Sequence, residues 1–309
     1  MLLDRETLEL APGVERLLGP EGLKTELFSC LVETNTPVCD SAAEAGDELV
    51  RLRRKVSTAA AGEGLAVAAA GAHPFSRPEE QQIVAEKRYL TMVEELGPGV
   101  KRQLVCGLHV HVGMESFADC LGTLAAITPW LPSVLALSLN SPYLAGVETE
   151  GLSVRAERLL ELPRGGRPPA MATEQEWEER IEATGEDYTR SWWDVRPHPR
   201  LGTLEVRIPD QPTSVERATA LAALVQALCA RPPDEQPAGD YLSQRAAAAA
   251  GSASGERLLA LVRPAARELG TSELVDSLHG PPEALRQLEV GRREGLAAVA
   301  ADLVGRTAA

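Results

Sequence analysis

One short stretch of the chain alternates between apolar and polar residues with a period of two, which is the spacing of a half-buried β-strand. In "CGLHVHVGM", residues 106–114, His109 and His111 fall on one face, and the apolar residues around them fall on the other. Because side chains alternate across a strand, this pattern predicts a sheet with two imidazoles on one face. A glycine at each end of the pair leaves room for another group to approach that face.

Two further stretches carry charges in the same way. In "TLEVRIPD", residues 203–210, Glu205 and Arg207 share a face opposite three apolar residues. In "TELFSCLVETNT", residues 25–36, Glu33 follows an apolar run. A charge inside such a run is costly unless it is paired or bound to a metal. The three strands could therefore bring imidazole, carboxylate and guanidinium groups together at one site.

Each pattern also has a simpler explanation when it is taken alone. The two histidines could form an ordinary polar sheet face, Glu205 and Arg207 a surface pair, and Glu33 the end of a strand. A metallohydrolase with a His-x-His pair would need further metal histidines on later strands. The only later histidines are His198, in a loop bounded by prolines, and His279. The sequence therefore favours a metallohydrolase least.

The rest of the chain predicts helices between short strands, and hence an α+β fold. A proline-rich break, "PPDEQPAGD", spans residues 232–240. It divides the chain into a main domain over 1–231 and a helical C-terminal segment over 232–309 that packs on it. A short strand that starts at residue 65 and leads into a loop with His73 and Pro74 is expected beside helices at 40–64 (N-cap Asp40), 79–96, 174–187 and 213–231 (N-cap Thr213 or Ser214). Residues 116–139 are expected to form helical segments interrupted by Pro129 and Pro132, and residues 240–309 to form alanine-rich helices.

Composition limits the classes of partner and compartment. The chain has 309 residues, of which 44% are hydrophobic, so it can bury a large core. A net charge of −14 argues against a nucleic-acid partner, which requires clustered Lys and Arg. The five cysteines are scattered and odd in number, which indicates reduced thiols. No signal peptide or run of 18 apolar residues is recognisable, so we expect a cytoplasmic protein with no membrane partner.

Several separated motifs, taken in order, resemble a known family. They are "KTELFSCLVETNTPVC", "GLAVAAAGAHPFS", "LVCGLHVHVG", "NSPYLAGVETEGLSVRAERL" and "WWDVRPHPRLGTLEVRIPD". The chain resembles the glutamate–cysteine ligase type 2 family, the YbdK-like carboxylate-amine ligases, over residues 1–231. The resemblance implies a glutamine synthetase-like catalytic domain, in which a curved antiparallel sheet forms an active-site funnel and helices cover its back.

The resemblance also implies a reaction. ATP and Mg²⁺ (or Mn²⁺) are the expected cofactors, and a glutamate-like acid and a cysteine-like amine are the expected substrates. The acid would attack ATP to form an acyl phosphate, and the amine would then displace phosphate to form an amide. The products would be the amide, ADP and phosphate, whether the glutamate–cysteine ligase activity is weak or full. A homodimer is the oligomeric state that the resemblance suggests.

Individual roles follow from the same resemblance. The expected metal ligands are three carboxylates and one imidazole: Glu26, Glu33, Glu205 and His109. His111 would orient its neighbour, although either histidine could be the ligand. Hard oxygen ligands of this kind suit Mg²⁺ or Mn²⁺ better than zinc. Five arginines are expected to bind phosphate or substrate: Arg207 and Arg196 in catalysis, Arg155 as a carboxylate clamp, and Arg200 and Arg245 in binding the nucleotide or the acid.

The chain departs from the family pattern in two places. Family members open with a strand that carries a Gly-x-Glu-Glu-Glu-Phe motif, whose glutamates bind metal, whereas this sequence starts at "MLLDRETLEL". Near the C-terminus, the family's Asn-Arg-Trp sequence is replaced by "SQRAAAAAG", which keeps only Arg245. These departures leave a second expectation open, namely a catalytically degenerate relative that binds a nucleotide or an amino acid.

Overall fold

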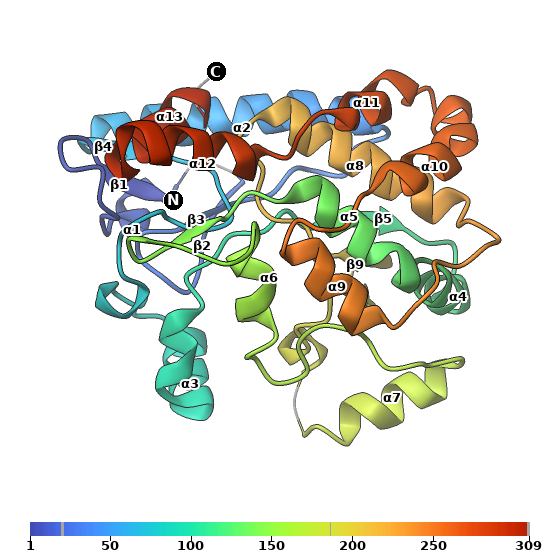
Figure 1. Ribbon diagram of the computed structural model, residues 1–309. Coiled ribbons are helices and arrows are strands. Elements are labelled where there is room, and N and C mark those ends of the chain that lie inside the picture. Colours follow the sequence, from blue (N-terminus) through green and yellow to red (C-terminus); the bar gives the residue numbers. More distant parts are fainter. Residues whose placement is uncertain (20–21, 186, 308–309) are drawn as a thin grey trace.

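The computed structural model describes residues 1–19, 22–185 and 187–307 (Figure 1). Among these residues, the strands form four separate antiparallel sheets. The largest has the order β5-β9-β8, and the other three are pairs. The strands are β1 (Leu2–Asp4) with β4 (Leu65–Val67), β2 (Leu23–Thr25) with β3 (Val32–Thr34), β6 (Tyr143–Leu144) with β7 (Val147–Glu148), and β5 (Val110–Gly113), β9 (Thr203–Val206) and β8 (Val195–His198).

Helices make up most of the remaining ordered structure. In Figure 1, α2, α8 and α10 to α13 lie along one side of the molecule, and α3 and α7 lie at the opposite side. The helices are α1 (Val14–Leu17), α2 (Ala42–Gly62), α3 (Lys87–Leu96), α4 (Phe117–Ile127), α5 (Leu131–Ser138), α6 (Val154–Leu159), α7 (Glu174–Glu182), α8 (Val215–Ala230), α9 (Tyr241–Ala249), α10 (Glu256–Glu268), α11 (Ser272–Asp276), α12 (Glu283–Glu294) and α13 (Leu296–Thr307). The 3₁₀ turns are η1 (Pro78–Glu80), η2 (Gly97–Arg102), η3 (Thr128–Trp130), η4 (Tyr188–Arg190) and η5 (Ser277–His279).

This content of helices and short antiparallel sheets confirms the predicted α+β class. Several boundaries differ from the prediction. The stretch 25–36 is not one strand, because β2 ends at Thr25 and β3 begins at Val32, so that the chain reverses between them. The stretch 79–96 contains η1 and α3 in place of one continuous helix. The cap of α2 is Ser41, whose hydroxyl accepts a hydrogen bond from the Glu44 N–H, and not Asp40. The curved sheet and its funnel remain a prediction.

The three-stranded sheet has the two faces that the alternation predicted. Leu204, Val206 and Ile208 are fully buried, and the valines of β5 pack against the same core. Helices α4 and α8 contact the sheet strands and supply much of that core. The apolar face of the sheet is therefore anchored, and the face that carries the ionisable groups is directed away from α8.

The C-terminal helices are integrated with the rest of the fold. Helix α9 packs on α5, α10 packs on α8, and α13 packs on β4. Their apolar residues belong to both large core clusters, as Leu259 does in one and Leu303 does in the other. The boundary at residue 231 stays a prediction, since these contacts describe packing and not independent folding.

One stretch is longer and more apolar than the sequence led us to expect. Residues 117–138, which span α4, η3 and α5, are long and apolar enough to cross a membrane, with a mean hydropathy of 1.6. In the folded chain, 67% of the most apolar window is buried inside the protein. Leu131 and Leu135, for example, lie in the main core cluster. Burial of this kind is typical of a core helix, which passes the same length and composition test.

Candidate active site

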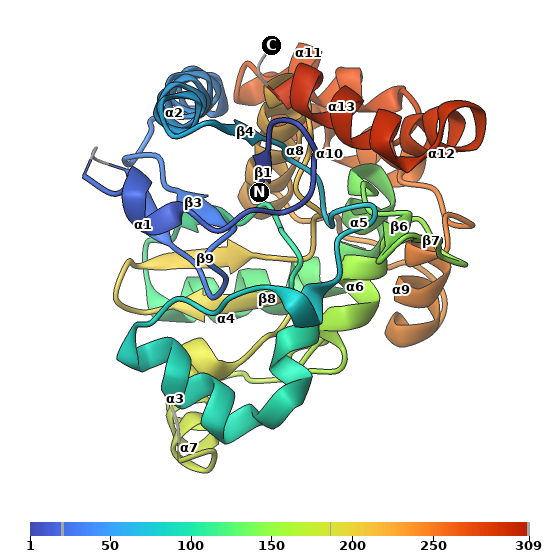
Figure 2. The same cartoon turned by 90° about the vertical axis from the view of Figure 1, so that its left-hand side faces the viewer.

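Strand register brings three ionisable side chains into one row across the sheet. Glu205 of β9 pairs with His111 of β5 on one side and with Arg196 of β8 on the other. Directly paired residues on antiparallel strands have side chains that point to the same face. Figure 2 shows β9 with β3 above it and α3 below it. The row is the centre of the site.

Glu205 is a buried carboxylate held by two guanidinium groups. Its side chain is 3% exposed. The Nε of Arg196 donates to Oε2 at 2.7 Å, and the Nη1 of Arg207 donates to Oε1. Burial alone would raise the pKa of Glu205, but the charges of the two guanidinium groups, Arg207 and Arg196, outweigh it and hold that pKa far below the usual range. Glu205 is therefore ionised at neutral pH.

The two imidazoles lie beside this carboxylate. The Nδ1 of His109 is 3.4 Å from Oε1 of Glu205 and 3.4 Å from Nη1 of Arg207. The Nδ1 of His111 is 2.9 Å from the Thr203 hydroxyl, and its Nε2 is 3.8 Å from Oε1 of Glu205. Desolvation lowers the pKa of both histidines; Arg207 lowers that of His109 further, and the charge of Glu205 opposes the shift in both. Both imidazoles are therefore neutral at pH 7.

The β2–β3 hairpin contributes the carboxylates of Glu26 and Glu33. Burial raises the pKa of Glu26, and the charge of Glu33 raises it further, whereas a hydrogen bond from the Leu27 N–H and the charge of Arg207 lower it. The charges of Glu33 and Arg207 both act on Glu26, so Glu26 lies within electrostatic range of each. The roles of Glu26 and Glu33 as metal ligands stay a prediction.

Three of the predicted arginines are engaged elsewhere. Arg155 is buried and donates to the carbonyls of Arg207 and Ile208. Arg245 is buried in a two-bond ion pair with Asp194. Arg200 is exposed and paired with Asp187. The expected carboxylate clamp at Arg155 differs from this arrangement, because both of its terminal nitrogens already donate to main-chain oxygens.

Some residues of the site were not expected. Thr203 fixes the ring of His111, and its position two residues before Glu205 on β9 would have placed it on the same face. The ring of His198 lies 5.4 Å from that of His111, although the sequence assigned His198 to a loop. Tyr188, in η4, packs edge-on against His198 at 5.3 Å. No spacing in the sequence indicates Tyr188.

A preformed metal cage is absent from the part of the chain that the structure describes, where no three His, Cys, Asp or Glu side chains group closely enough to hold an ion. Mg²⁺, however, usually needs only one or two protein carboxylates, because waters and substrate phosphates supply the remaining ligands. Glu26 and Glu33 are near enough to repel each other, which is the environment that a cation relieves. The residues present therefore fit a Mg²⁺ that binds together with a nucleotide.

Comparison with known proteins gives one consistent result. Residues 4–277 match the family described as Glutamate-cysteine ligase family 2. The chain is 36% identical to a Rubrobacter xylanophilus protein named "Putative glutamate–cysteine ligase 2-3", over 95% of this chain and 91% of that protein. It is 37% identical to a Herpetosiphon aurantiacus protein named "Putative glutamate–cysteine ligase 2", over 74% of this chain and 62% of that protein.

Proposed function

The chain belongs to glutamate–cysteine ligase family 2, and from this premise we propose that it is an ATP-dependent carboxylate-amine ligase. The proposed substrates are a glutamate-like acid and a cysteine-like amine, joined as an amide through an acyl phosphate. The single observation that carries the proposal is the row of Arg196, Glu205 and His111 with Arg207 beside it. The row offers the guanidinium of Arg207 to a phosphate next to carboxylates that suit a divalent cation. Arg196, whose Nη1 donates to the carbonyls of Thr189 and Ser191, would hold Glu205 in place.

Arg207 is the residue proposed to bind the phosphoryl group during its transfer from ATP. Its guanidinium lies at the sheet face, with Nη1 on Glu205 and near His109, and its side chain is 14% exposed. A planar guanidinium can offer two parallel N–H donors to phosphoryl oxygens. As negative charge develops on those oxygens during transfer, such donors bind the transition state more strongly than the ground state. Glu205 would hold Arg207 and Arg196 in place before ATP binds.

Glu26 and Glu33 are the proposed ligands of Mg²⁺. The ion would neutralise charge on the phosphates of ATP. The prediction that His109 and Glu205 also ligate the metal stays a prediction, because two guanidinium groups already compete for the oxygens of Glu205. The hairpin would thus hold the ion, and the sheet would hold the phosphoryl group.

The neutral imidazoles are suited to the second half of the reaction. An amine attacks only in its unprotonated form, so the ammonium group of the incoming amino acid must lose a proton. His111 is neutral, is oriented by Thr203 and has a part-exposed ring. We assign it as the group that accepts this proton, and assign His109 to the contact with Arg207.

The proposal is tested by measuring ADP release with Mg²⁺-ATP while the acid and the amine are varied in turn. The proposed ligase releases ADP only when glutamate and an amine such as cysteine are both present, and forms the amide in equal amount. Nucleotide binding without turnover would instead support the non-catalytic relative. Amide hydrolysis without ATP would support a metallohydrolase.

A further inference from the structure

Arg155 is buried behind the segment that carries Arg207. It is the second residue of helix α6, is 2% exposed, and donates to the chain that leaves β9. Its Nη1 donates to the carbonyl of Ile208 at 2.9 Å, and its Nη2 donates to the carbonyl of Arg207 at 2.8 Å. The N–H of the same residue, Arg207, donates to the carbonyl of Asp194 at 2.8 Å. The main chain of Arg207 is thus held at both its donor and its acceptor.

Arg155 is itself placed by a buried carboxylate. Oδ1 of Asp210 lies 4.0 Å from Nη1 of Arg155 and accepts a hydrogen bond from the Ser153 hydroxyl at 2.7 Å. Oδ2 accepts from the Ser141 hydroxyl at 2.7 Å and from the Asn140 N–H at 2.9 Å. Asp210 is fully buried. We call these four residues, Asp210, Asn140, Ser141 and Ser153, the Asp210 cluster.

Two glycines leave the space that this arrangement occupies. A Cβ at Gly107, just before β5, would lie 2.0 Å from Nη2 of Arg155. A Cβ at Gly71 would lie 2.8 Å from the Ser141 hydroxyl and 2.9 Å from Oδ2 of Asp210. Only glycine can occupy these sites without moving the guanidinium or the carboxylate. Glycine at these two positions therefore allows Arg155 and Asp210 to pack against the main chain.

We propose that Arg155, held by the Asp210 cluster, is a positioning residue that fixes Arg207 against Glu205 and His109. The proposal rests on the proposed function for the importance of Arg207, but the contact geometry stands without it. This positioning role differs from the carboxylate clamp expected for Arg155, because a clamp would need N–H donors that are free to bind the substrate. Arg155 acts on the reaction only through the main chain of Arg207.

The position of Arg207 can be read from the histidine ring signals in NMR spectra, because the chain has five histidines and His109 contacts Arg207. Arg207→Lys gives the His109 signal expected when the guanidinium is lost. Arg155→Lys and Gly107→Ala should each shift the His109 signal in the same direction, while the signals of His73 and His279 stay in place. Gly107→Ala retains Arg155 and displaces it, and because residue 107 lies two residues from His109, Arg155→Lys is the deciding variant of the two.

A matched control is Arg53→Lys. Arg53 also donates from both terminal nitrogens to two consecutive carbonyls, those of Thr213 and Pro212, but it lies on α2 away from the sheet face. It should leave the His109 signal unchanged. If the His109 signal also stays in place in Arg155→Lys and Gly107→Ala, the positioning role is wrong. Loss of the fold in both variants would equally overturn it in favour of a purely structural role.

Steady-state kinetics separates positioning from binding. For Arg155→Lys, we expect kcat to fall about tenfold or more while the KM for the acid and for ATP changes less than about threefold. A clamp for the acid would instead raise its KM with kcat unchanged, and that result would overturn the proposal. If the wild-type chain releases no ADP, the proposed function fails, and the NMR comparison still decides the role of Arg155.

Discussion

At the scale of single residues, Glu205 is the side chain whose loss should matter most. In Glu205→Gln, the neutral amide cannot balance Arg196 and Arg207, so two guanidinium groups remain with no buried anion between them. We expect the free energy of unfolding to fall by about 3 kcal/mol in urea titrations. We also expect kcat/KM for ADP release to fall at least tenfold, or about 1.4 kcal/mol of transition-state stabilisation.

The control for this variant is Glu63→Gln, which breaks the exposed ion pair with Arg16. That change should alter the free energy of unfolding by less than about 1 kcal/mol, because exposed pairs contribute little. If Glu205→Gln is as stable and as active as the wild type, the ion pairs of Glu205 with Arg196 and Arg207 contribute neither to stability nor to catalysis.

Arg207→Lys tests geometry and not charge. A lysine ammonium keeps the positive charge but cannot present two parallel donors to phosphoryl oxygens. We expect kcat to fall by more than the KM for ATP rises, because the lost contact strengthens as the transition state forms. Initial-rate measurements over a range of ATP concentrations give both constants. A rise in KM alone would indicate that Arg207 only binds the ground state.

The residue scale also shows what spacing can and cannot predict. The period of two correctly placed His109, His111, Glu205 and Arg207 on one face, because alternation is a property of the strand itself. The structural partners of Arg155 could not be read in this way. Its contacts join segments far apart in sequence, and a motif gives the identity of a residue without showing which of its donors are already used.

At the scale of elements, His73 connects β4 and the loop after it to the turn that follows β1. The residue is 2% exposed; its Nε2 is 2.9 Å from the carbonyl of Leu8, and its Nδ1 accepts a hydrogen bond from the Ser76 N–H at 3.0 Å. Desolvation lowers the pKa of His73 to about 4, while the hydrogen bond to Leu8 opposes the shift. The folded protein therefore holds a neutral imidazole in a pH range where the unfolded chain is protonated.

The sign of the pH dependence follows. A folded-state pKa of about 4 lies below the ordinary value of 6.5, so the folded state binds fewer protons between the two. The contribution of neutral His73 to the free energy of unfolding is fully present above pH 6.5. It should fall by up to about 3 kcal/mol as the pH drops to 4. Urea titrations at several pH values measure this. In His73→Gln, the protein should be less stable at pH 7 but should lack this part of the slope.

A His279→Gln control, made at an exposed histidine, should keep the slope of the wild type. If His73→Gln also shows the full loss in free energy of unfolding between pH 6.5 and 4, other groups cause that loss, and the contacts of His73 with Leu8 and Ser76 do not depend on pH.

Element boundaries were less predictable than element faces. Helix α8 begins after Ser214, one of its two expected caps, because a serine hydroxyl satisfies an open N–H of the first turn. The β2–β3 reversal was missed, since an apolar run of this length is compatible with one buried strand or with two short ones. His198 was assigned to a loop because prolines flank it, yet it ends β8, where the sheet accepts Pro197 on an edge strand.

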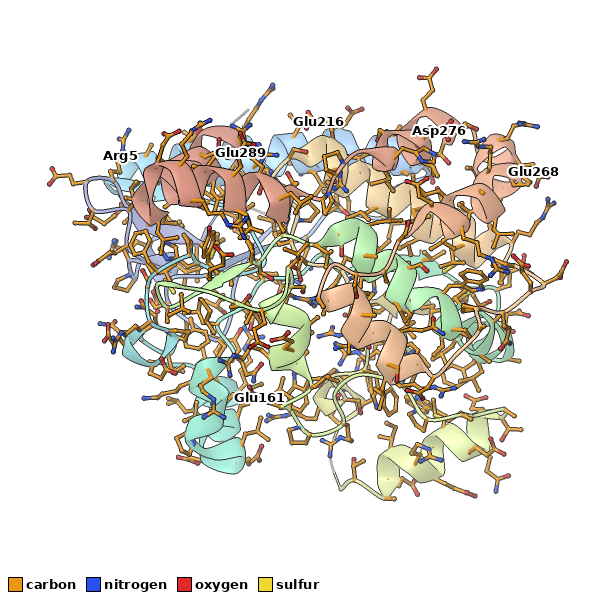
Figure 3. The ribbon with its side chains drawn as sticks, viewed as in Figure 1. Arg5, Glu161, Glu216, Glu268, Asp276 and Glu289 are labelled. Carbon is orange, nitrogen blue, oxygen red and sulfur yellow. The ribbon has the colours of Figure 1, made fainter. Side chains whose placement is uncertain are left out.

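At the scale of the whole molecule, acidic side chains outnumber basic ones. Figure 3 labels Glu216, Glu289, Asp276 and Glu268 along the outer helical side of the protein, which also carries basic residues such as Arg5 and Arg286. This agrees with the net charge of −14. The proposed phosphate site has Arg207 at its centre, with Arg196 buried behind Glu205, so the cationic groups are local. A site of this kind suits a small anionic substrate and does not offer the extended basic surface that nucleic acid requires.

The last prediction concerns the predicted boundary at residue 231. Tyr241 of α9 donates to Asp194, and Gln287 of α12 donates to Asn140 of the Asp210 cluster. Helices α9 to α13 also bury apolar residues in both core clusters. Removing residues 232–309 would expose that apolar surface and leave buried polar groups without partners. We therefore expect residues 1–231 alone to aggregate or to remain without fixed tertiary structure.

In the intact chain, the same contacts should make unfolding a single event. All four tryptophans precede residue 231, so their fluorescence reports mainly on the main domain, although Trp130 also lies near Arg257 of α10. Far-ultraviolet circular dichroism reports on α9 to α13 as well. The two signals should change at the same urea concentration and with the same slope, because the two parts share their cores. If the dichroism change precedes the fluorescence change, or if residues 1–231 fold and release ADP alone, then the C-terminal helices form a dispensable segment, and the site is supported by the main domain alone.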